Sequence, residues 1–380
     1  MECTVLIPTY NRPNHLKRIL SYYNQYGNDL PIVIADSSSE ENKKLNRETV
    51  SSFHNPCFSY LDKYDPSINP LRKILDAFKQ VSTMYCVFCA DDDFVTPSGI
   101  RESIEFLDNN PDYTTAYGKG ENFLLQSFRG SEPQFRYLNY RSHSNTYVEP
   151  KDRLIYEVAN YNDTSYYAVR RTLFMKMLYE EVSKATTIDT YDGKADTAIS
   201  ILFGELIISW LSAIYGKMKC LDTLFCVREY CTPAKLVGFR PALSDLMKDK
   251  SYGEKKQKFS DCVAGHLYSQ SGISKMEAYK IIDKAIMIYA KKSNPLARKI
   301  SIILNNLNLP DWLDRGIRKL YHWLDSVIIQ IYQAASRICS SGNSAYPVNS
   351  RYRNDLNQIR LCILANAEEI YGVDASSKPY

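Results

Sequence analysis

The chain has 380 residues, of which 44% are hydrophobic and 24% are charged, an ordinary globular composition with room for two or three domains. No run of about 18 uncharged apolar residues occurs, so the sequence predicts no membrane-spanning helix, and we expect no signal peptide because Met1 leads directly into a strand. The ten cysteines are scattered, which favours reduced thiols in a cytosolic protein. No two histidines share a spacing typical of metal ligands, so none is given a catalytic role.

The net charge of +4 is unevenly distributed. Residues 231–300 hold 14 Lys and Arg against 6 Asp and Glu, a net charge of +8, which leaves −4 for the rest of the chain. This pattern is typical of an anionic partner such as a membrane surface or phosphate, or of a lysine-rich helical face exposed to solvent. Nucleic acid is disfavoured because the lysines lack regularly interleaved aromatic residues.

The first hundred residues predict alternating strands and helices. Asn14 is expected to cap the first helix, and Asn69 followed by Pro70 is typical of the start of another. Such alternation indicates a mostly parallel sheet flanked by helices. The expected buried strands are residues 3–8, 31–35, 58–61 and 85–90.

Polar residues follow three of these strands directly: Thr9, Asp36, and the triplet Asp91-Asp92-Asp93. Ligands of open α/β sheets bind at the carboxyl ends of the strands, so these residues are expected to meet at one edge. Three adjacent carboxylates would repel one another unless they are compensated. A divalent cation, Mg²⁺ or Mn²⁺, accepts such oxygen ligands together with phosphate. The sequence therefore predicts a metal-bound phosphate compound at this edge.

The pattern is less regular after residue 110. A helix is expected to begin at Thr172, and after about residue 240 the chain is predicted to be helical and basic. An apolar stripe over residues 313–331 indicates a helix that packs on its own domain or lies on a membrane surface. The other expected elements are strands at residues 113–117, 166–170 and 220–227, and a helix at residues 196–215.

Three segments match the motifs of a known family: Val5-Leu-Ile-Pro-Thr-Tyr-Asn-Arg12, Ile32-Val-Ile-Ala-Asp-Ser37 and Val87-Phe-Cys-Ala-Asp-Asp-Asp-Phe94. In order and spacing they resemble the inverting family 2 glycosyltransferases of the GT-A fold. The resemblance implies an α/β fold with a mostly parallel sheet flanked by helices and a helical C-terminal region. It implies a glycosyltransferase domain over residues 1–235, with a nucleotide-sugar half at 1–120 and an acceptor half at 121–235. Residues 236–380 would form the helical, basic region.

The resemblance also assigns roles at the nucleotide. Pro8, Thr9 and Arg12 would border it, with Thr9 near the base. Asp36 would accept a hydrogen bond from uracil or another base, unless it only closes a turn after its strand.

At the diphosphate, the resemblance places Arg72 or Lys73 near the phosphates, although both also fit a solvated helical face. Asp91 would contact the ribose or the metal shell, Asp93 would hold the metal through the diphosphate, and Asp92 could substitute. A bound cation would then assist departure of the nucleoside diphosphate.

Two departures from the family pattern leave the sugar donor open. The glycine-bearing segment that usually precedes the aspartate strand is replaced by Asn69-Pro-Leu-Arg-Lys73. The Gln-x-x-Arg-Trp motif of processive synthases is absent, which argues against a polymerising enzyme. Weaker similarity at Tyr166-Tyr-Ala-Val-Arg170 and around Glu205 resembles a bacterial surface-polysaccharide subgroup.

Inversion requires a carboxylate that takes the proton from the acceptor hydroxyl. Glu205 is the first candidate because it is a lone acid in an apolar helix, where burial would raise its pKa. Asp163 is the second candidate. Arg228 follows the last predicted strand and could reach the diphosphate or pair with Glu229. Further candidates, which could instead line a lid, are Asp189, Asp192 and Asp196.

The sequence thus predicts a metal-dependent glycosyltransferase of bacterial cell-surface polysaccharide synthesis. Its donor would be a nucleotide sugar, with UDP favoured, and its acceptor a glycan or polyprenyl-linked saccharide. We expect a cytoplasmic protein, with contact to the inner face of the cell membrane through the basic C-terminal helices. Two alternatives are a non-catalytic nucleotide-sugar-binding subunit and a nucleotidyltransferase. A nucleotidyltransferase would need a glycine-rich phosphate loop, which Pro8–Pro13 does not supply.

Overall fold

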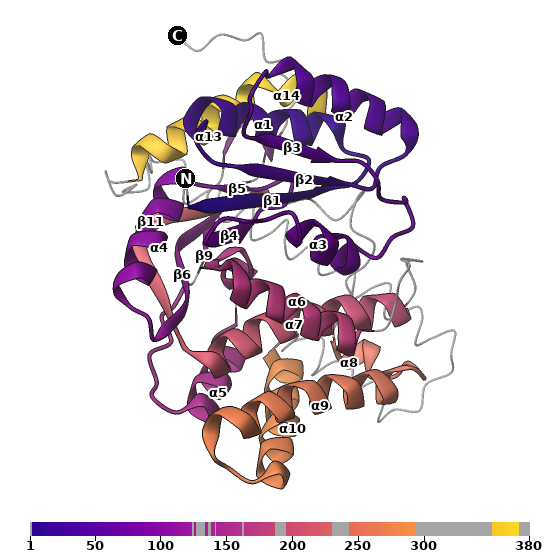
Figure 1. Cartoon of the computed structure of the whole chain (residues 1–380), viewed down its shortest axis with the longest axis vertical. Coiled ribbons are helices and arrows are strands. Elements are labelled where there is room, and N and C mark those ends of the chain that lie inside the picture. The colour runs from indigo at the N-terminus through magenta and orange to yellow at the C-terminus, as the bar shows by residue number, and fades with distance from the viewer. Residues whose placement is uncertain are drawn as a thin grey trace.

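The structure is a computed structural model in which a nine-stranded sheet is flanked by helices (Figure 1). The parts of the chain that it describes are residues 2–123, 125–126, 134–135, 138–140, 142–161, 163–186, 195–229, 243–292 and 352–371. The predicted stripe at 313–331 lies outside these residues.

The N-terminal half of the sheet is parallel and buried. Strand β1 (Cys3–Thr9) lies between β2 (Ile32–Asp36) and β4 (Tyr85–Phe88), and β3 (Phe58–Leu61) follows at the edge. All of these pairings are parallel, and Thr9 is in register with Asp36. The four predicted strands are therefore confirmed, and their carboxyl ends lie at one edge.

The second half of the sheet is mixed. β10 (Val169–Arg171) runs antiparallel between β4 and the long strand β6 (Tyr113–Phe123). β6 pairs in parallel with β11 (Lys217–Glu229), whose far end is antiparallel to β5 (Phe94–Val95). Strand β9 (Leu138–Tyr140) also pairs with β6, while β7 (Leu125–Gln126) and β8 (Gln134–Phe135) form a separate pair. β10 runs opposite to its neighbours β4 and β6, which share one direction. β5 and β9 also pair antiparallel, and the remaining strands of the described sheet run in one direction, so this sheet is mostly parallel.

Helices cover both faces of the sheet. In Figure 1, α1 (Pro13–Tyr26) and α2 (Glu40–Ser52) lie above it, and α3 (Pro70–Phe78) and α6 (Thr172–Ala185) lie below. The remaining described helices are α4 (Pro97–Asn109), α5 (Pro150–Asn160), η1 (Asp163–Tyr167), α7 (Ala195–Tyr215), α8 (Leu243–Leu246), α9 (Tyr252–Ser271), α10 (Lys275–Lys292), α13 (Arg353–Ala365) and α14 (Ala367–Tyr371).

Two local predictions need correction, and a third is confirmed. Helix α1 begins at Pro13, and its N-cap is Arg12 rather than Asn14, because proline fits the first helical position. The predicted strand at residues 166–170 begins only at Val169, in β10, whereas Tyr166 and Tyr167 end the short 3-10 helix η1. The Asn69 cap is confirmed, since its Oδ1 accepts a hydrogen bond from the Leu71 amide at 2.8 Å.

Helix α7 confirms the helix predicted at residues 196–215 and begins one residue earlier, at Ala195. Its segment Ala198–Tyr215 has a mean hydropathy of 1.8. By length and composition alone, this segment is long and apolar enough to cross a membrane. However, 72% of this segment is buried inside the protein, where it packs against α5, α6 and α9. These contacts are those of the core helix of a folded domain.

The C-terminal region packs at two separate places. Helices α9 and α10 lie against α5 and α7, whereas α13 and α14 lie beside α1 (Figure 1). The Cys362 thiol contacts the Arg18 carbonyl at 3.2 Å, and Lys17 pairs with Glu369 at 2.6 Å. Residues near the end of the chain are therefore packed against its first helix.

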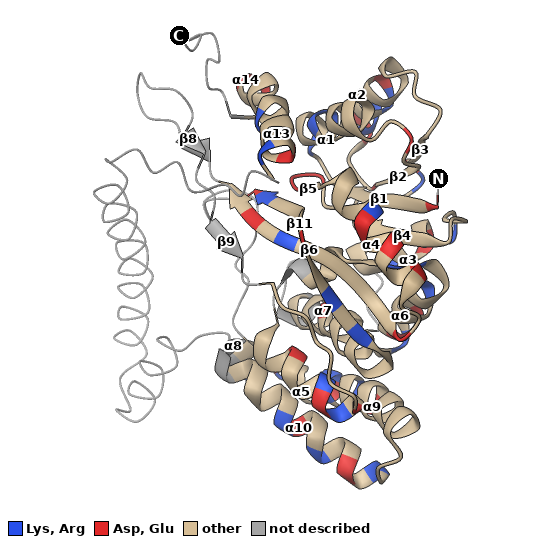
Figure 2. Cartoon of the chain, turned by 90° about the vertical axis from the view of Figure 1, so that its left-hand side faces the viewer, with Lys and Arg blue, Asp and Glu red and all other residues tan. Residues whose placement is uncertain are grey.

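The described part of the basic region carries mixed charge. Figure 2 shows acidic positions interspersed among the basic positions of α9 and α10. Lys256 pairs with Asp283 at 2.6 Å, and Lys258 pairs with Glu254 at 2.8 Å. These contacts fit the solvated helical face, one of the two interpretations left open by the sequence.

Candidate active site

The aspartate triplet begins three residues after the end of β4 at Phe88, at the edge where β1 and β2 also end. The Thr9 hydroxyl donates to Asp91 Oδ2 at 2.7 Å. Arg12 reaches two carboxylates from the loop after β1, with Nη1 at 3.2 Å from Asp91 Oδ1 and 2.7 Å from Asp92 Oδ2. The predicted meeting of the first and fourth strand ends is therefore observed.

Asp93 faces the other half of the sheet. Its Oδ2 accepts hydrogen bonds from the Tyr167 hydroxyl and, at 3.1 Å, from Arg228 Nε. Its Oδ1 accepts from the Glu229 amide at 2.9 Å. The Arg228 guanidinium also lies 5.3 Å from the centre of the Tyr167 ring. Residues from β4, η1 and β11 thus converge on one carboxylate, and Arg228 pairs with Asp93 rather than with Glu229.

Asp91 and Asp93 are nearly inaccessible to solvent. Burial, and then the neighbouring Asp92 charge, raise the pKa of each to about 6, against the lowering effect of Arg12 on Asp91 and of Arg228 on Asp93. Both carboxyl groups therefore titrate close to neutral pH. A cation that entered the cluster would favour their charged forms.

The structure compensates the triplet with arginines, which the sequence argument for a cation did not include. Arg12 and Arg228 contact the carboxylates directly. The donor set still fits Mg²⁺ or Mn²⁺, because it consists of carboxylate oxygens and because guanidinium groups suit a diphosphate. Asp91 and Asp93 would hold the cation, with Asp92 beside them.

Arg18 is a site residue that the sequence did not reveal. It is buried in α1, and its Nη2 donates to the Asp92 carbonyl and to Glu229 Oε2, each at 2.8 Å. Its guanidinium lies 5.2 Å from the centre of the Phe94 ring. Arg18 therefore ties the backbone of the triplet to the end of β11. Its place beside the apolar stripe of α1 was the only available signal.

We expect Arg18→Met to lower the free energy of unfolding by about 3–5 kcal/mol, because it leaves the Glu229 carboxylate buried without its cation. Lys17→Met is the matched control, since it removes an exposed ion pair on the same helix that is worth about 0–1 kcal/mol. Chemical denaturation measures both. The double variant Arg18→Met/Glu229→Gln should recover part of the loss. Equal effects of the two single variants would contradict this role.

Lys73 lies at the carboxyl ends of β1 and β2. Its ammonium donates to the Thr9 carbonyl and to Ser37 Oγ, each at 2.8 Å. Burial lowers the pKa of Lys73 to about 8, although Asp91 and Asp36 act in the opposite direction. Of the two predicted cations of α3, Lys73 is thus the one that joins this edge.

Asp36 is fully buried and already holds three hydrogen bonds. Its oxygens accept from the Ser38 amide at 2.7 Å, Asn46 Nδ2 at 2.7 Å and the Tyr60 hydroxyl at 2.5 Å. These bonds fix the loop after β2. The predicted contact with a nucleotide base would require neighbouring groups to move. Pro8, on β1, is partly buried and pairs with Ala35.

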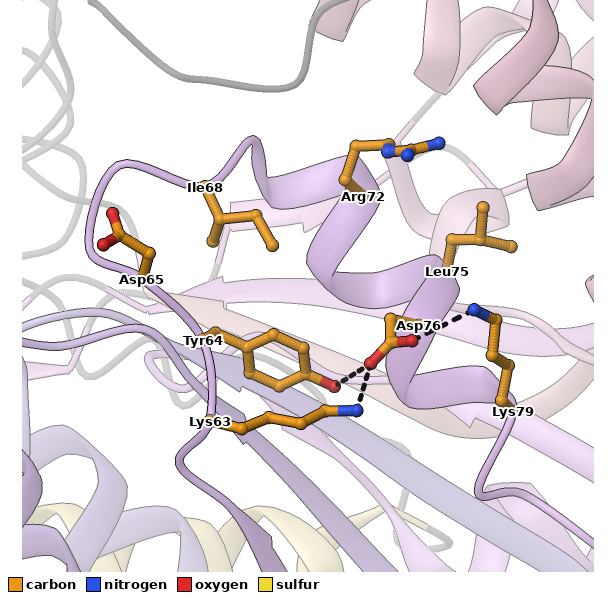
Figure 3. A pocket seen from close by; sticks show the side chains of 8 residues that line it. All are labelled: Lys63, Tyr64, Asp65, Ile68, Arg72, Leu75, Asp76 and Lys79. Carbon is orange, nitrogen blue, oxygen red and sulfur yellow. Dashed lines mark hydrogen bonds and ion pairs between the residues drawn. The ribbon is translucent and has the colours of Figure 1, made fainter.

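Arg72 is exposed and points elsewhere. Its Nη1 donates to Ser183 Oγ at 2.6 Å, and it lines an open pocket of about 330 Å³ beside α3. Figure 3 shows that Lys63 and Lys79 converge on Asp76 in this pocket, whereas Arg72 points away from Asp76. None of the aspartates of the triplet lines it. A phosphate contact by Arg72 stays a prediction.

Glu205 lies on α7, next to tyrosines that lead to the triplet. Its charge contributes to the raised pKa of Tyr179, for which burial is the largest cause. The Tyr179 hydroxyl lies 2.7 Å from that of Tyr166, which precedes the Asp93 partner Tyr167. The preceding Gly204 permits close approach to α3, since a Cβ there would lie 2.5 Å from Leu71 Cδ1. Glu205 itself is partly buried, and its charge acts on Tyr179 of α6.

The side chains of the other candidate bases lie outside the residues that the structure describes. Asp163 begins η1, but its side chain lies outside the described residues, as does that of Asp196. Asp189 and Asp192 lie wholly outside them.

The chain is similar to one family model and to several solved structures. Residues 4–178 match the family model described as glycosyl transferase family 2. Among solved structures, S. aureus TarS residues 1–349 have 12% identity and a TM-score of 0.40, over 77% of this chain and 90% of that one. The same protein in complex with UDP-GlcNAc has 14% identity and a TM-score of 0.40, over 77% and 82% of the two chains.

A further solved structure is the mannosyltransferase PcManGT from Pyrobaculum calidifontis in complex with GDP-Man and Mn²⁺. It has 12% identity and a TM-score of 0.37, over 98% of this chain and 88% of that one. No curated protein sequence matches the chain. The family match covers 175 of the 380 residues. By this match, residues 4–178 of the chain are similar to glycosyl transferase family 2.

Proposed function

We propose that the chain transfers a sugar from a nucleoside diphosphate donor to a hydroxyl group of a glycan or lipid-linked acceptor, with inversion and with the help of Mg²⁺ or Mn²⁺. The observation that carries the proposal is the buried triplet Asp91–Asp93, which is held by Thr9 and Arg12 from one side and by Arg228 from the other. Carboxylates and guanidinium groups together suit a cation and a diphosphate.

The donor would lie across the carboxyl ends of β1, β2 and β4. Asp91 and Asp93 would hold a divalent cation, which when bound would supply Lewis-acid assistance to departure of the nucleoside diphosphate. Arg12 and Arg228, which pair with the aspartates, are placed to bind the diphosphate oxygens as well. Tyr167 and the Glu229 amide keep Asp93 in place through hydrogen bonds.

The acceptor would enter from the side of η1 and α7. Glu205 would take the proton from the attacking hydroxyl, because it is the partly buried carboxylate next to the Tyr179–Tyr166 pair. Its apolar helix limits access of water to the carboxylate, which suits a general base.

The biological setting that we propose is bacterial cell-surface polysaccharide synthesis, in the cytoplasm or at the inner face of the membrane, with a UDP-sugar as the donor. The support for it is the motif similarity at Tyr166–Arg170 and around Glu205. Membrane contact would involve basic C-terminal residues beyond α10.

A thermal-shift screen of UDP-, GDP-, CDP- and dTDP-sugars with Mn²⁺ tests the donor. The true donor at about 100 times its Kd should stabilise the protein by about 2.7 kcal/mol, and the others by much less. The matched blank is each nucleotide sugar without Mn²⁺, which should give a smaller shift. Equal shifts with and without metal would contradict the metal-dependent donor site. No shift with any nucleotide sugar would contradict donor binding itself.

A further inference from the structure

A second group of metal-ligating side chains lies away from the aspartate triplet, between α6 and α9. Glu181 is in α6, and Cys262 and His266 are one turn apart in α9. Their ligand atoms all lie within 4.8 Å of one another. Glu181 Oε2 lies 3.3 Å from His266 Nε2 and 3.8 Å from the Cys262 sulfur. We call these three residues the α6–α9 cluster.

The spacing fits a tetrahedral zinc ion. Zinc lies at about 2.0–2.2 Å from oxygen and nitrogen ligands and about 2.3 Å from thiolate sulfur. At tetrahedral angles these bond lengths place oxygen and nitrogen about 3.3 Å apart and oxygen and sulfur about 3.6 Å apart. The observed separations are 3.3 and 3.8 Å. The ligand atoms therefore need to move little to share one ion.

The outer atoms of the ligands already have partners. Lys184 Nζ lies 2.6 Å from Glu181 Oε1, the oxygen that faces away from His266. The Tyr215 hydroxyl lies 2.7 Å from His266 Nδ1. Groups that orient metal ligands usually sit at these positions, since they fix the imidazole tautomer and the carboxylate rotamer. The other ligand atoms of the cluster, Nε2, Oε2 and the sulfur, lie within 4.8 Å of one another.

We propose that Glu181, Cys262 and His266 bind a zinc ion that fastens α9 to α6, with water as the fourth ligand. The three residues are partly exposed, so an ion and a water molecule can reach them. When the ion binds, the sulfur–zinc bond forms and the thiol proton passes to solvent, and zinc takes the imidazole in its neutral form and the carboxylate in its ionised form. Because α9 also packs on α5 and α7, the ion would hold the helices after residue 243 on the glycosyltransferase fold.

The sequence did not indicate this site because its ligands include only one histidine. Cys262 and His266 have the i, i+4 spacing that puts two side chains on one face of a helix. The third ligand lies 81 residues before Cys262, and only the packing of α6 on α9 brings it close.

Titration of the full, metal-free chain with Co²⁺ tests the proposal, because a thiolate ligand produces a sulfur-to-cobalt charge-transfer band that oxygen ligands cannot. We expect one equivalent of Co²⁺ to produce the band and Zn²⁺ to abolish it. Cys262→Ser should remove the band, whereas Cys220→Ser, which alters another half-buried free thiol, should retain it. Asp93→Asn should also retain it, which separates this site from the donor site.

A second variant tests the site even if Cys262→Ser does not fold. Tyr215→Phe leaves all three ligands in place and should weaken Co²⁺ binding by about 10–100-fold. Zn²⁺ should also raise the melting temperature of the unaltered chain but not that of Cys262→Ser. Absence of the band in the unaltered chain, or its survival in Cys262→Ser, would overturn the proposal and leave a His266–Glu181 ion pair.

Discussion

Asp93→Asn is expected to lower kcat/KM for sugar transfer by about 10³-fold, which corresponds to about 4 kcal/mol of transition-state stabilisation. The substitution removes the carboxylate charge that we propose holds the cation. It also leaves Arg228 without its anionic partner at 3.1 Å. A radiolabelled or coupled transfer assay, with the donor identified by the thermal-shift screen, measures the loss.

Loss of activity must be separated from loss of the fold. Asn at position 93 can still accept hydrogen bonds from Tyr167 and Arg228 through its oxygen, but its amide nitrogen would face the Glu229 N–H. This mismatch should cost about 1–3 kcal/mol of unfolding free energy, so the variant should still fold. Asp112→Asn is the matched control. Asp112 directly precedes β6, at the opposite edge of the sheet, and should retain full activity. Full activity in Asp93→Asn would end the metal proposal.

The same carboxylates predict a pH dependence of metal binding. Burial raises the pKa of Asp91 and of Asp93 to about 6, so protons compete with the cation below that pH. The Kd for Mn²⁺ should therefore rise by at least about tenfold between about pH 7.5 and about pH 5. Calorimetric titration measures this dependence. An unchanged Kd would place the cation on other ligands.

The strand ends at the aspartate triplet could be predicted because they come from local patterns. Thr9, Asp36 and Asp91 each follow a short buried strand, and parallel pairing brings such strand ends to one edge. Sequence distance is irrelevant to this argument once the strands are recognised. The sequence therefore predicted the four parallel strands correctly, and it predicted correctly that their carboxyl ends lie at one edge of the sheet.

The partners of the triplet could not be predicted, because they depend on packing between distant segments. Tyr167 lies 74 residues from Asp93, and Arg228 lies 135 residues from it. No periodicity links these positions. β10 must reverse between β4 and β6 before Tyr167 can face Asp93, and the sequence indicated a simple strand at that point. For this reason the sequence did not predict that arginine side chains compensate the charge of the triplet.

The sequence also did not show which face of a helix points toward the site. Arg72 and Lys73 are adjacent on α3, yet one is exposed and the other joins β1 and β2. One step along the helix, about 100° around its axis, separates a pocket residue from a site residue, and composition does not distinguish them. Likewise, nothing local indicated that α13 would pack beside α1. The proposed acceptor side of the site has less support than the donor side, since the choice of Glu205 as the base depends on one helix, α7.

Glu205→Gln is expected to lower kcat by about 10²–10⁴-fold with little change in donor affinity, because it removes a proton acceptor and retains the shape of the side chain. Glu180→Gln, an exposed acid on α6, is the matched control and should leave kcat unchanged. The pH profile is the sharper test: the acidic limb of kcat in the unaltered chain should report the base and should disappear in Glu205→Gln. An unchanged kcat would move the base to another carboxylate, with Asp163 the next candidate, and would leave the donor site at Asp91 and Asp93 untouched. The two active-site variants therefore fail independently, since Asp93 acts on the leaving group and Glu205 on the attacking hydroxyl.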